Sequence, residues 1–284
     1  MAVLPQHSFQ FSQASLQDYV DCARRFQLRY LSRLSWPAIE TEPVLENERF
    51  LNQGAQFHRL VHQYLLGIPA ERLSAMVQAE DLSRWWENFL QYGLNPQEVQ
   101  GKFFPEITLA TPLGEHSLVG KFDLVVVSPG GEVSIMDWKT SRKRPQRNWL
   151  EKRLQTHVYP FLLVEAGACL NHAEPILPEQ VEMVYWFAQY PRQPERFSYD
   201  REKYLSDKSY LNELVEEIQA LDEDGFELTK DRKKSRFCVY RSLCNRGIEA
   251  GSMQEMDAML DSELGEQAEQ TIDLDFEQIA EIEF

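Results

Sequence analysis

Two short stretches carry acidic and basic side chains at the ends of predicted strands, namely G-K-F-D at 120–123 and D-W-K-T at 137–140. Residues two apart on a strand share a face, so Asp137 and Lys139 can lie together beside Asp123. Two carboxylates suit Mg²⁺ or Mn²⁺, with the Trp138 carbonyl in reach. Such an ion could polarise a phosphodiester and deprotonate water while Lys139 supplies charge. D-x-K alone favours a surface ion pair, because these residues are common.

Alternating apolar residues predict the strands that must hold these groups. The predicted strands are 103–110, 117–127, 133–138 and 181–188, and the first three form a meander that includes a Pro-Gly-Gly turn at 129–131. Helical periodicity predicts helices at 15–34, 46–66, 70–92, 148–166 and 202–221. Ser15, with Asp18 three residues later, resembles the start of a capping box. The order predicts one α/β domain with helices packed on a mixed sheet.

Length and composition exclude several classes of protein. The chain has 284 residues, 43% of them hydrophobic and 26% charged, which excludes collagen, a disulfide scaffold and a fully disordered chain. It contains no apolar run of about 18 residues and no secretory pattern at its start. We therefore expect a cytoplasmic protein without a membrane partner. Its four cysteines should be reduced thiols or metal ligands.

Charge is distributed unevenly along the chain. Eleven acids and no Lys or Arg lie within 251–284, which predicts a disordered acidic tail. Basic islands at 139–153 and 230–241 lie in the remaining, mildly acidic part. Phosphate binding depends on the local field, so the net charge of -16 does not exclude nucleic acid. A solvated basic surface is the alternative reading of each island.

A series of motifs resembles the RecB-like branch of the PD-(D/E)xK nuclease superfamily, which includes AddB-type and CRISPR-associated RecB-like exonucleases. The stretch at 9–30 resembles the family's opening pattern S-x-L-x-x-y-x-x-C-x-x-x-F. Four further motifs follow in the family's order. These are G-A-Q-F-H at 54–58, G-K-F-D at 120–123, D-W-K-T at 137–140 and Q-T-H-V-Y at 155–159. The resemblance implies a restriction-endonuclease-like core, and the ordered set is far more specific than any single motif.

Applied to these positions, the resemblance implies metal ligation by His58, Asp123 and Asp137, with Lys139 catalytic. The i, i+4 pair Gln155 and Tyr159 shares a helix face. The resemblance implies that this pair contacts DNA or orients Lys139. A strand glutamate, Glu106, is a further candidate, and an exposed strand acid is its alternative reading. A zinc pair of His58 with His62 is a competing hypothesis without an evident third ligand. A second competing hypothesis is that His58 is a buried structural histidine.

The cysteines match part of the iron–sulfur pattern found in many of these relatives. Cys22 occupies the N-terminal position, Cys238 and Cys244 match C-x5-C, and Ser235 stands at the remaining position. A cubane normally takes four cysteines, so a cluster and a set of buried thiols both remain open; Cys169 is off the pattern. Either reading places the N- and C-terminal segments together.

These observations predict a nuclease domain over residues 1–250, followed by the tail at 251–284. We expect a helical part at about 12–95, a sheet core at about 100–220 and a cysteine-bearing segment at 230–250. The resemblance implies a Mg²⁺- or Mn²⁺-dependent deoxyribonuclease, an exonuclease on single-stranded or frayed DNA in repair or recombination, with a helicase or other repair protein as partner. DNA-binding candidates are Arg142, Lys143, Arg144 and Arg147. A catalytically silent DNA-binding or scaffold subunit is the alternative.

Overall fold

Strand β3 organises the sheet because it pairs with three other strands. The computed structural model describes residues 9–35, 42–97, 99–247 and 251. Strand β3 (His116–Val127) is antiparallel to β2 (Lys102–Leu113) along its full length. On its other side, β3 pairs first in parallel with β1 (Gln10–Ser12) and then antiparallel with β4 (Val133–Lys139). The predicted meander β2-β3-β4 is therefore confirmed.

Two more strands extend the sheet beyond β4. Strand β5 (Val181–Phe187) runs parallel to β4, and β6 (Glu195–Ser198) is antiparallel to β5. The result is the expected mixed α/β sheet, with the order β1-β3-β4-β5-β6 and β2 on the other side of β3. Strands β1 and β6 were not predicted, because three or four residues are too few to show alternation.

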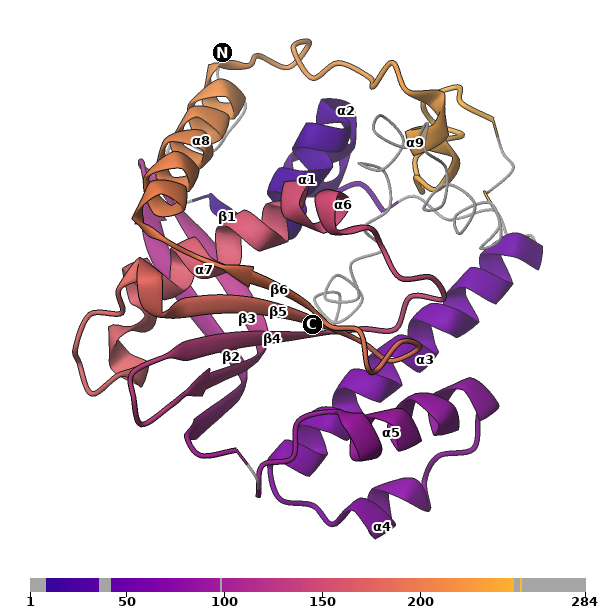
Figure 1. Ribbon diagram of the computed structural model, residues 1–284. Coiled ribbons are helices and arrows are strands. Elements are labelled where there is room, and N and C mark those ends of the chain that lie inside the picture. The colour runs from indigo at the N-terminus through magenta and orange to yellow at the C-terminus, as the bar shows by residue number, and fades with distance from the viewer. Residues whose placement is uncertain (1–8, 36–41, 98, 248–250, 252–284) are drawn as a thin grey trace.

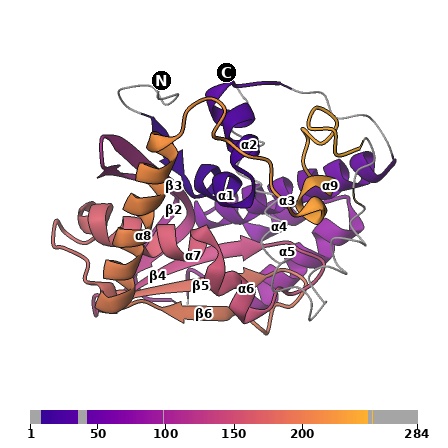
Figure 2. The ribbon, with the colours of Figure 1, turned by 90° about the horizontal axis from the view of Figure 1, so that it is seen from above.

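Helices cover both faces of the sheet (Figures 1 and 2). One face packs against α1, α7 and α8, and the other against α3 and α5. Side chains alternate between two cores, so that Ile135 and Tyr185 join the first and Trp138 and Trp186 the second. The α-helices are α1 (Gln13–Asp21), α2 (Ala23–Phe26), α3 (Glu42–Leu65), α4 (Ala70–Ser74), α5 (Glu80–Tyr92), α6 (Arg147–Lys152), α7 (Leu154–Ala166), α8 (Arg201–Ala220) and α9 (Arg232–Arg236).

Three predicted helices are interrupted in the structure. The first begins earlier than expected, because Ser12 is the N-cap and Ser15 completes its capping box. It breaks at Cys22, whose backbone is extended, and continues through α2 into the π-helix Gln27–Leu31. The predicted helix at 70–92 is divided into α4 and α5, and the one at 148–166 breaks at Arg153. Short 3₁₀ helices span Gly167–Leu170 and Pro178–Gln180.

The N- and C-terminal segments meet, as the sequence predicted. The amide of Arg24 donates to the Glu227 carbonyl at 3.1 Å, and the side-chain amide of Gln27 donates to the Glu223 carbonyl at 2.7 Å. The Tyr240 hydroxyl donates to the Leu34 carbonyl at 2.9 Å. The acidic tail predicted at 251–284 lies, apart from residue 251, outside the described residues. No described helix has the length and apolar character needed to cross a membrane.

Candidate active site

The candidate site lies where β3 changes partners. Its pairing with β1 ends at Val119 and its pairing with β4 begins at Leu124. Between these points the strands part, so Asp123 and Asp137 face one another across the antiparallel register without a ladder bond. The Asp123 carboxylate accepts a hydrogen bond from the Trp138 amide at 2.8 Å instead. This side-chain bond satisfies a β4 amide and fixes the first carboxylate beside the second.

Helix α3 brings the predicted histidine to the first carboxylate. The Nδ1 atom of His58 lies 3.1 Å from Oδ1 of Asp123, and both side chains are largely buried. Burial opposes charge on the imidazole, but the nearby Asp123 carboxylate outweighs it and raises the pKa of His58. Burial likewise acts to raise the pKa of Asp123, but the charge and hydrogen bond of His58 prevail and lower it. An imidazolium–carboxylate pair is therefore favoured.

Helix α7 supplies the group that joins the second carboxylate to the lysine. The side-chain amide of Gln155 donates to Oδ1 of Asp137 at 2.7 Å, and its oxygen accepts from Nζ of Lys139 at 2.8 Å. Nζ of Lys139 also lies 3.1 Å from Oδ2 of Asp137. Burial raises the pKa of Asp137 to about 6; the lysine charge opposes this rise, and the Asp123 charge adds to it. Gln155 thus closes a ring of contacts that orients Lys139.

Three other predicted site residues occupy distinct places. Tyr159 is 1% exposed and donates to the Lys121 carbonyl at 2.8 Å, so it lies on the side of β3 that β1 and β4 leave unpaired; its role toward DNA or Lys139 stays a prediction. The Trp138 indole packs edge-on against Phe89 of α5, whereas its carbonyl as a ligand stays a prediction. Glu106 lies opposite Asp123 in the β2–β3 register with a φ of 53°, and its carboxylate pairs with Lys121 at 2.6 Å.

The donor set has the chemistry of a divalent-cation site. It combines one imidazole with two buried carboxylates, and the raised pKa of Asp137 reflects burial and like charge that a cation would relieve. In the structure, Lys139 and His58 provide that positive charge themselves. Within the described residues, no three His, Cys, Asp or Glu side chains stand in ligating geometry as they are. The hypothesis of a zinc pair with His62 therefore gains no third ligand from these residues.

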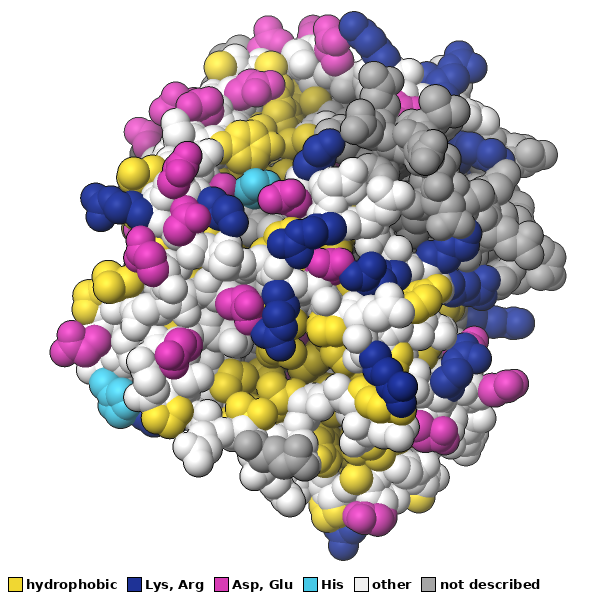
Figure 3. All heavy atoms as spheres, in the orientation of Figure 1, with side chains coloured by type: hydrophobic (Ala, Val, Ile, Leu, Met, Phe, Trp, Pro, Cys, Tyr) yellow, Lys and Arg dark blue, Asp and Glu magenta, His cyan; other side chains and the backbone are white. Residues whose placement is uncertain are grey.

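The predicted DNA-binding cations lie on the loop after β4 and on α6. Figure 3 shows Lys and Arg side chains gathered across the middle of one face, around this loop. Arg144 and Arg147 both pair with Glu195 of β6, and the Arg142 guanidinium lies 5.0 Å from the centre of the Phe50 ring. Lys143 is partly exposed. One acid therefore offsets two of the four cations, and DNA contact by this group stays a prediction.

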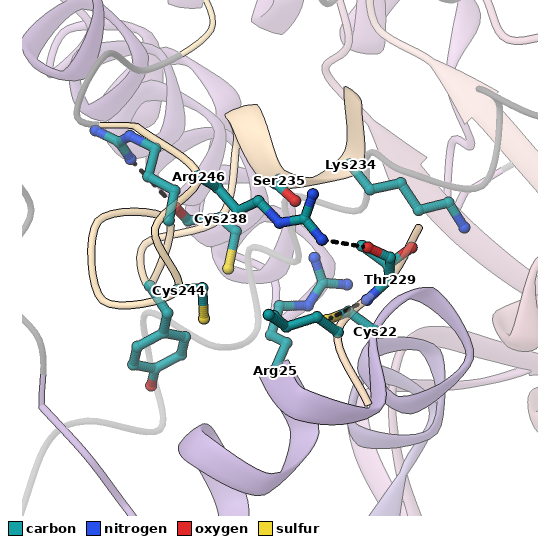
Figure 4. Close-up of a pocket in the computed structure, with 11 residues that line it drawn as sticks. Cys22, Arg25, Thr229, Lys234, Ser235, Cys238, Cys244 and Arg246 are labelled. Atoms are coloured by element: carbon teal, nitrogen blue, oxygen red, sulfur yellow. Dashed lines mark hydrogen bonds between the residues drawn. The ribbon is translucent and has the colours of Figure 1, made fainter. Parts of the chain in front are cut away.

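The predicted cysteine cluster is gathered into one small cavity (Figure 4). Cys22, Ser235, Cys238 and Cys244 all line it, which confirms the expected meeting of distant segments. Cys169 lies elsewhere and is exposed. The Thr229 amide lies 3.5 Å from Sγ of Cys22. Sequence reasoning thus found the residues of this pocket but not what surrounds them.

The residues present do not supply the four thiolates of a cubane cluster. Serine takes the fourth position, and the cavity of about 20 Å³ has room for about one water molecule. Burial raises the pKa of both the Cys238 and Cys244 thiols. No step of the chemistry below is assigned to a cluster.

Buried ion pairs missed by the sequence analysis hold this region instead. Arg25 contacts Asp18 at 2.7 Å and Asp21 at 3.0 Å, and Lys234 contacts Asp21 at 3.0 Å. Asp21 and Lys234 are 2% and 5% exposed, so the pair is desolvated. We call Asp18, Asp21, Arg25 and Lys234 the terminal clasp. Its only sequence signal was a pair of acids in the predicted helix 15–34, which by itself names no partner.

A model of the PD-(D/E)XK nuclease superfamily matches residues 10–245 of this chain. No curated protein sequence matches this chain. Among solved structures, SSO0001 is similar at 12% identity with a TM-score of 0.39, over 84% of this chain and 87% of that one. A protein from Eubacterium rectale, named as a candidate exonuclease, is similar at 9% identity with a TM-score of 0.46, over 74% and 79% of the two chains.

Proposed function

Because the chain belongs to the PD-(D/E)XK nuclease superfamily, we propose that it is a metal-dependent deoxyribonuclease that hydrolyses phosphodiester bonds. The observation that carries this proposal is the convergence of Asp123, Asp137, Lys139 and Gln155 at the parting of β3 and β4. A scaffold protein would not need a buried like-charge pair beside a lysine, because such a pair costs stability. Activity is the simplest reason to retain it.

The proposed roles follow from the positions of the side chains. His58, Asp123 and Asp137, with the Trp138 carbonyl, would hold Mg²⁺ or Mn²⁺. When bound, such an ion lowers the pKa of water and offsets charge on the phosphate. Lys139, whose side chain is 24% exposed, donates to a non-bridging phosphate oxygen or orients the attacking water. Gln155 holds the ammonium group of Lys139 beside the carboxylates. Little reorganisation of the site is therefore needed during the reaction.

We further propose that the substrate is single-stranded or frayed DNA, cut from an end during repair or recombination, with a helicase or other repair protein as partner. The basic group after β4 supports a polyanionic substrate, because cations close to a catalytic centre attract phosphate over about one Debye length. The end preference and the repair setting come from the motifs that resemble RecB-like exonucleases.

The test uses end-labelled single-stranded, double-stranded and closed circular DNA of one sequence, with Mg²⁺, Mn²⁺ or EDTA. We expect metal-dependent cleavage of linear single-stranded DNA and no cleavage of the closed circular DNA. Label at the 5′ or the 3′ end then gives polarity. Asp137→Asn and Lys139→Met should be inactive, and Lys208→Met, on the surface of α8, is the matched control. Equal cleavage by all variants would indicate a contaminant.

The scaffold alternative predicts a different result in the same samples. A silent subunit would bind the labelled strands in EDTA and cleave none of them with either metal. Iron analysis and the visible spectrum of anaerobically purified protein test the predicted cluster separately. With three thiols in a cavity of about 20 Å³, we expect no stoichiometric iron; a brown protein containing stoichiometric iron would contradict this reading of the pocket.

A further inference from the structure

A second, larger cavity lies on the other side of α7 from the candidate site. It has a volume of about 210 Å³ and is enclosed by α6, α7, β6 and α8. His157 lines this cavity, whereas Gln155, two residues earlier on α7, contacts Lys139. Residues two apart on a helix are separated by about 200° around its axis. The two sites therefore share a helix but open on opposite faces of it.

A buried hydrogen-bonded network fixes the polar wall of this cavity. Asp207 is 5% exposed, and its two oxygens contact Nδ1 of His157 at 2.7 Å and the Tyr199 hydroxyl at 2.9 Å. With Nδ1 held in this way, Nε2 is the ring nitrogen that a ligand can reach, and the His157 side chain is 31% exposed. Because the buried Asp207 carboxylate is hydrogen-bonded through both oxygens, it keeps the His157 imidazole in one orientation.

The helical wall of the cavity carries a carbonyl that lacks its usual donor. Pro160 lies inside α7 and has no amide hydrogen, so it cannot donate to the carbonyl four residues earlier, which belongs to Thr156. Thr156 and Pro160 both line the cavity. A hydrogen-bond acceptor of the main chain thus belongs to the same wall as the imidazole, which gives the cavity both donors and acceptors.

The opposite wall is aromatic and bordered by cations. Phe197 lines the cavity, and the Arg147 guanidinium lies over its ring at 4.2 Å. Lys203 also lines the cavity, and its ammonium donates to the Ser198 carbonyl at 2.6 Å. Guanidinium and aromatic planes are stacking surfaces for nucleobases. Lys203 at the border suits a phosphate attached to such a base, whereas Arg147 pairs with Glu195 at 2.7 Å and the acid Glu151 also lines the cavity.

We infer that this cavity binds a nucleobase that carries a phosphate, with the base against Pro160 and the stacked side chains of Arg147 and Phe197 and the phosphate toward Lys203. Its volume is below the range of about 300–1,000 Å³ that encloses drug-sized ligands, so it admits one base and not an oligonucleotide. The base comes either from a free nucleotide or from the bound strand. The second source rests on the proposed function; the first does not.

The cavity is connected to the candidate active site through Tyr185. The Thr156 hydroxyl lies 2.7 Å from the Tyr185 hydroxyl, and Nζ of Lys139 lies 5.6 Å from the centre of the Tyr185 ring. A ligand that moves Thr156 would therefore act on a residue in contact with the lysine. The position suits a site that senses nucleotides near the reaction.

Equilibrium dialysis of the full chain in EDTA tests the free-nucleotide source. The probes are dAMP and dTMP, with ribose 5-phosphate and inorganic phosphate as base-free controls. We expect saturable binding of the two nucleotides alone, at one site per chain. Arg147→Gln and Phe197→Leu should each weaken it roughly tenfold or more, the loss of one stacking partner. Lys208→Gln, on α8 outside the cavity, should change nothing.

An oligonucleotide that contains 2-aminopurine tests the strand source, because its fluorescence changes when the base leaves the stack. If this fluorescence change is lost in Phe197→Leu, and no free nucleotide binds, the cavity is assigned to a base of the bound strand. Absence of both signals overturns the inference, as does equal binding of base-free phosphates or unaltered binding by both variants. Thermal unfolding of each variant shows that it is folded. Nucleotide binding without nuclease activity would sink the proposed function alone; activity without either signal would sink this inference alone.

Discussion

The candidate active site and the terminal clasp are both buried polar clusters assembled from distant segments, yet they are built differently. At the active site, Asp123 and Asp137 lie together, and Asp137 has a raised pKa of about 6. At the clasp, Asp18 and Asp21 are each matched by Arg25 or Lys234. The clasp pairs its acids with cations and can serve stability. His58 and Lys139 also pair with the two acids of the active site, but burial and the Asp123 charge still raise the pKa of Asp137, and a bound cation would relieve this cost.

The largest expected effect is on catalysis at the active site. Asp137→Asn keeps the shape and the hydrogen bond from Gln155 but removes the charge. We expect cleavage of linear DNA to fall by roughly 10³-fold or more, because transition-state charge is stabilised through this carboxylate. Single-turnover cleavage rates measure the effect. A loss below about tenfold would show that the like-charge pair is structural, and the contrast with the clasp would fail.

The clasp should show its effect in stability instead. Asp21→Asn leaves Lys234 and Arg25 partly unpaired in a buried position, so we expect the free energy of unfolding to fall by about 3–5 kcal/mol. Urea titration followed by tryptophan fluorescence measures it. The double variant Asp21→Leu/Lys234→Met should recover part of the loss, because neither charge is then left buried alone. A single variant as stable as the wild type would show that the clasp is not an energetic unit.

Gln155→Leu distinguishes positioning from direct chemistry. The change releases Lys139 from its tether but removes no charge, so we expect the cleavage rate to fall roughly 10- to 100-fold, less than for Asp137→Asn. The pH–rate profile should shift as well, since Lys139 and Asp137 lose a shared partner. Gln155→Glu can still accept from the lysine but loses the hydrogen bond to Asp137 and adds a like charge beside it, so it should not restore the rate. An unshifted profile in both variants would argue for a merely structural glutamine.

Stability in EDTA should depend on pH through Asp137 at the active site. Asp137 has its pKa raised from 3.8 to about 6, so the folded state holds this proton more tightly than the unfolded state does. Its effect is a loss of stability that develops as pH rises from about 4 to about 6. Asp137→Asn should therefore stabilise the metal-free protein at pH 7 and lose that advantage near pH 4. Urea midpoints at both pH values test the sign.

The smallest effect is expected at the thiol pocket beside the clasp. Cys238→Ser replaces a partly buried thiol whose pKa is raised by burial, so we expect a loss of about 1 kcal/mol or less and unchanged cleavage. Urea titration and the DNA assay measure the two quantities. Collapse of the fold on this change would instead indicate that the thiol has a ligand.

Local patterns predicted the long elements and the residues of the candidate site, but not the contacts between segments. Alternation located β3 and β4, and the motifs located Asp123, Asp137 and Lys139 next to each other. The break at Cys22 was missed because the Thr229 amide that contacts its sulfur is about 200 residues away. The pairing of His157 with Asp207 was missed for the same reason, since nothing in either local sequence names the other.

The parting of β3 from β1 and β4 has a consequence for how this sheet tolerates change. If β1 were extended by four residues, its backbone could pair with positions 120–123 and the sheet would gain hydrogen bonds. The same extension would close the gap in which the carboxylates meet. Selection for a more regular sheet and selection for chemistry therefore oppose each other at this position. A variant with a continuous ladder would be more stable but would lose the gap that holds the two carboxylates.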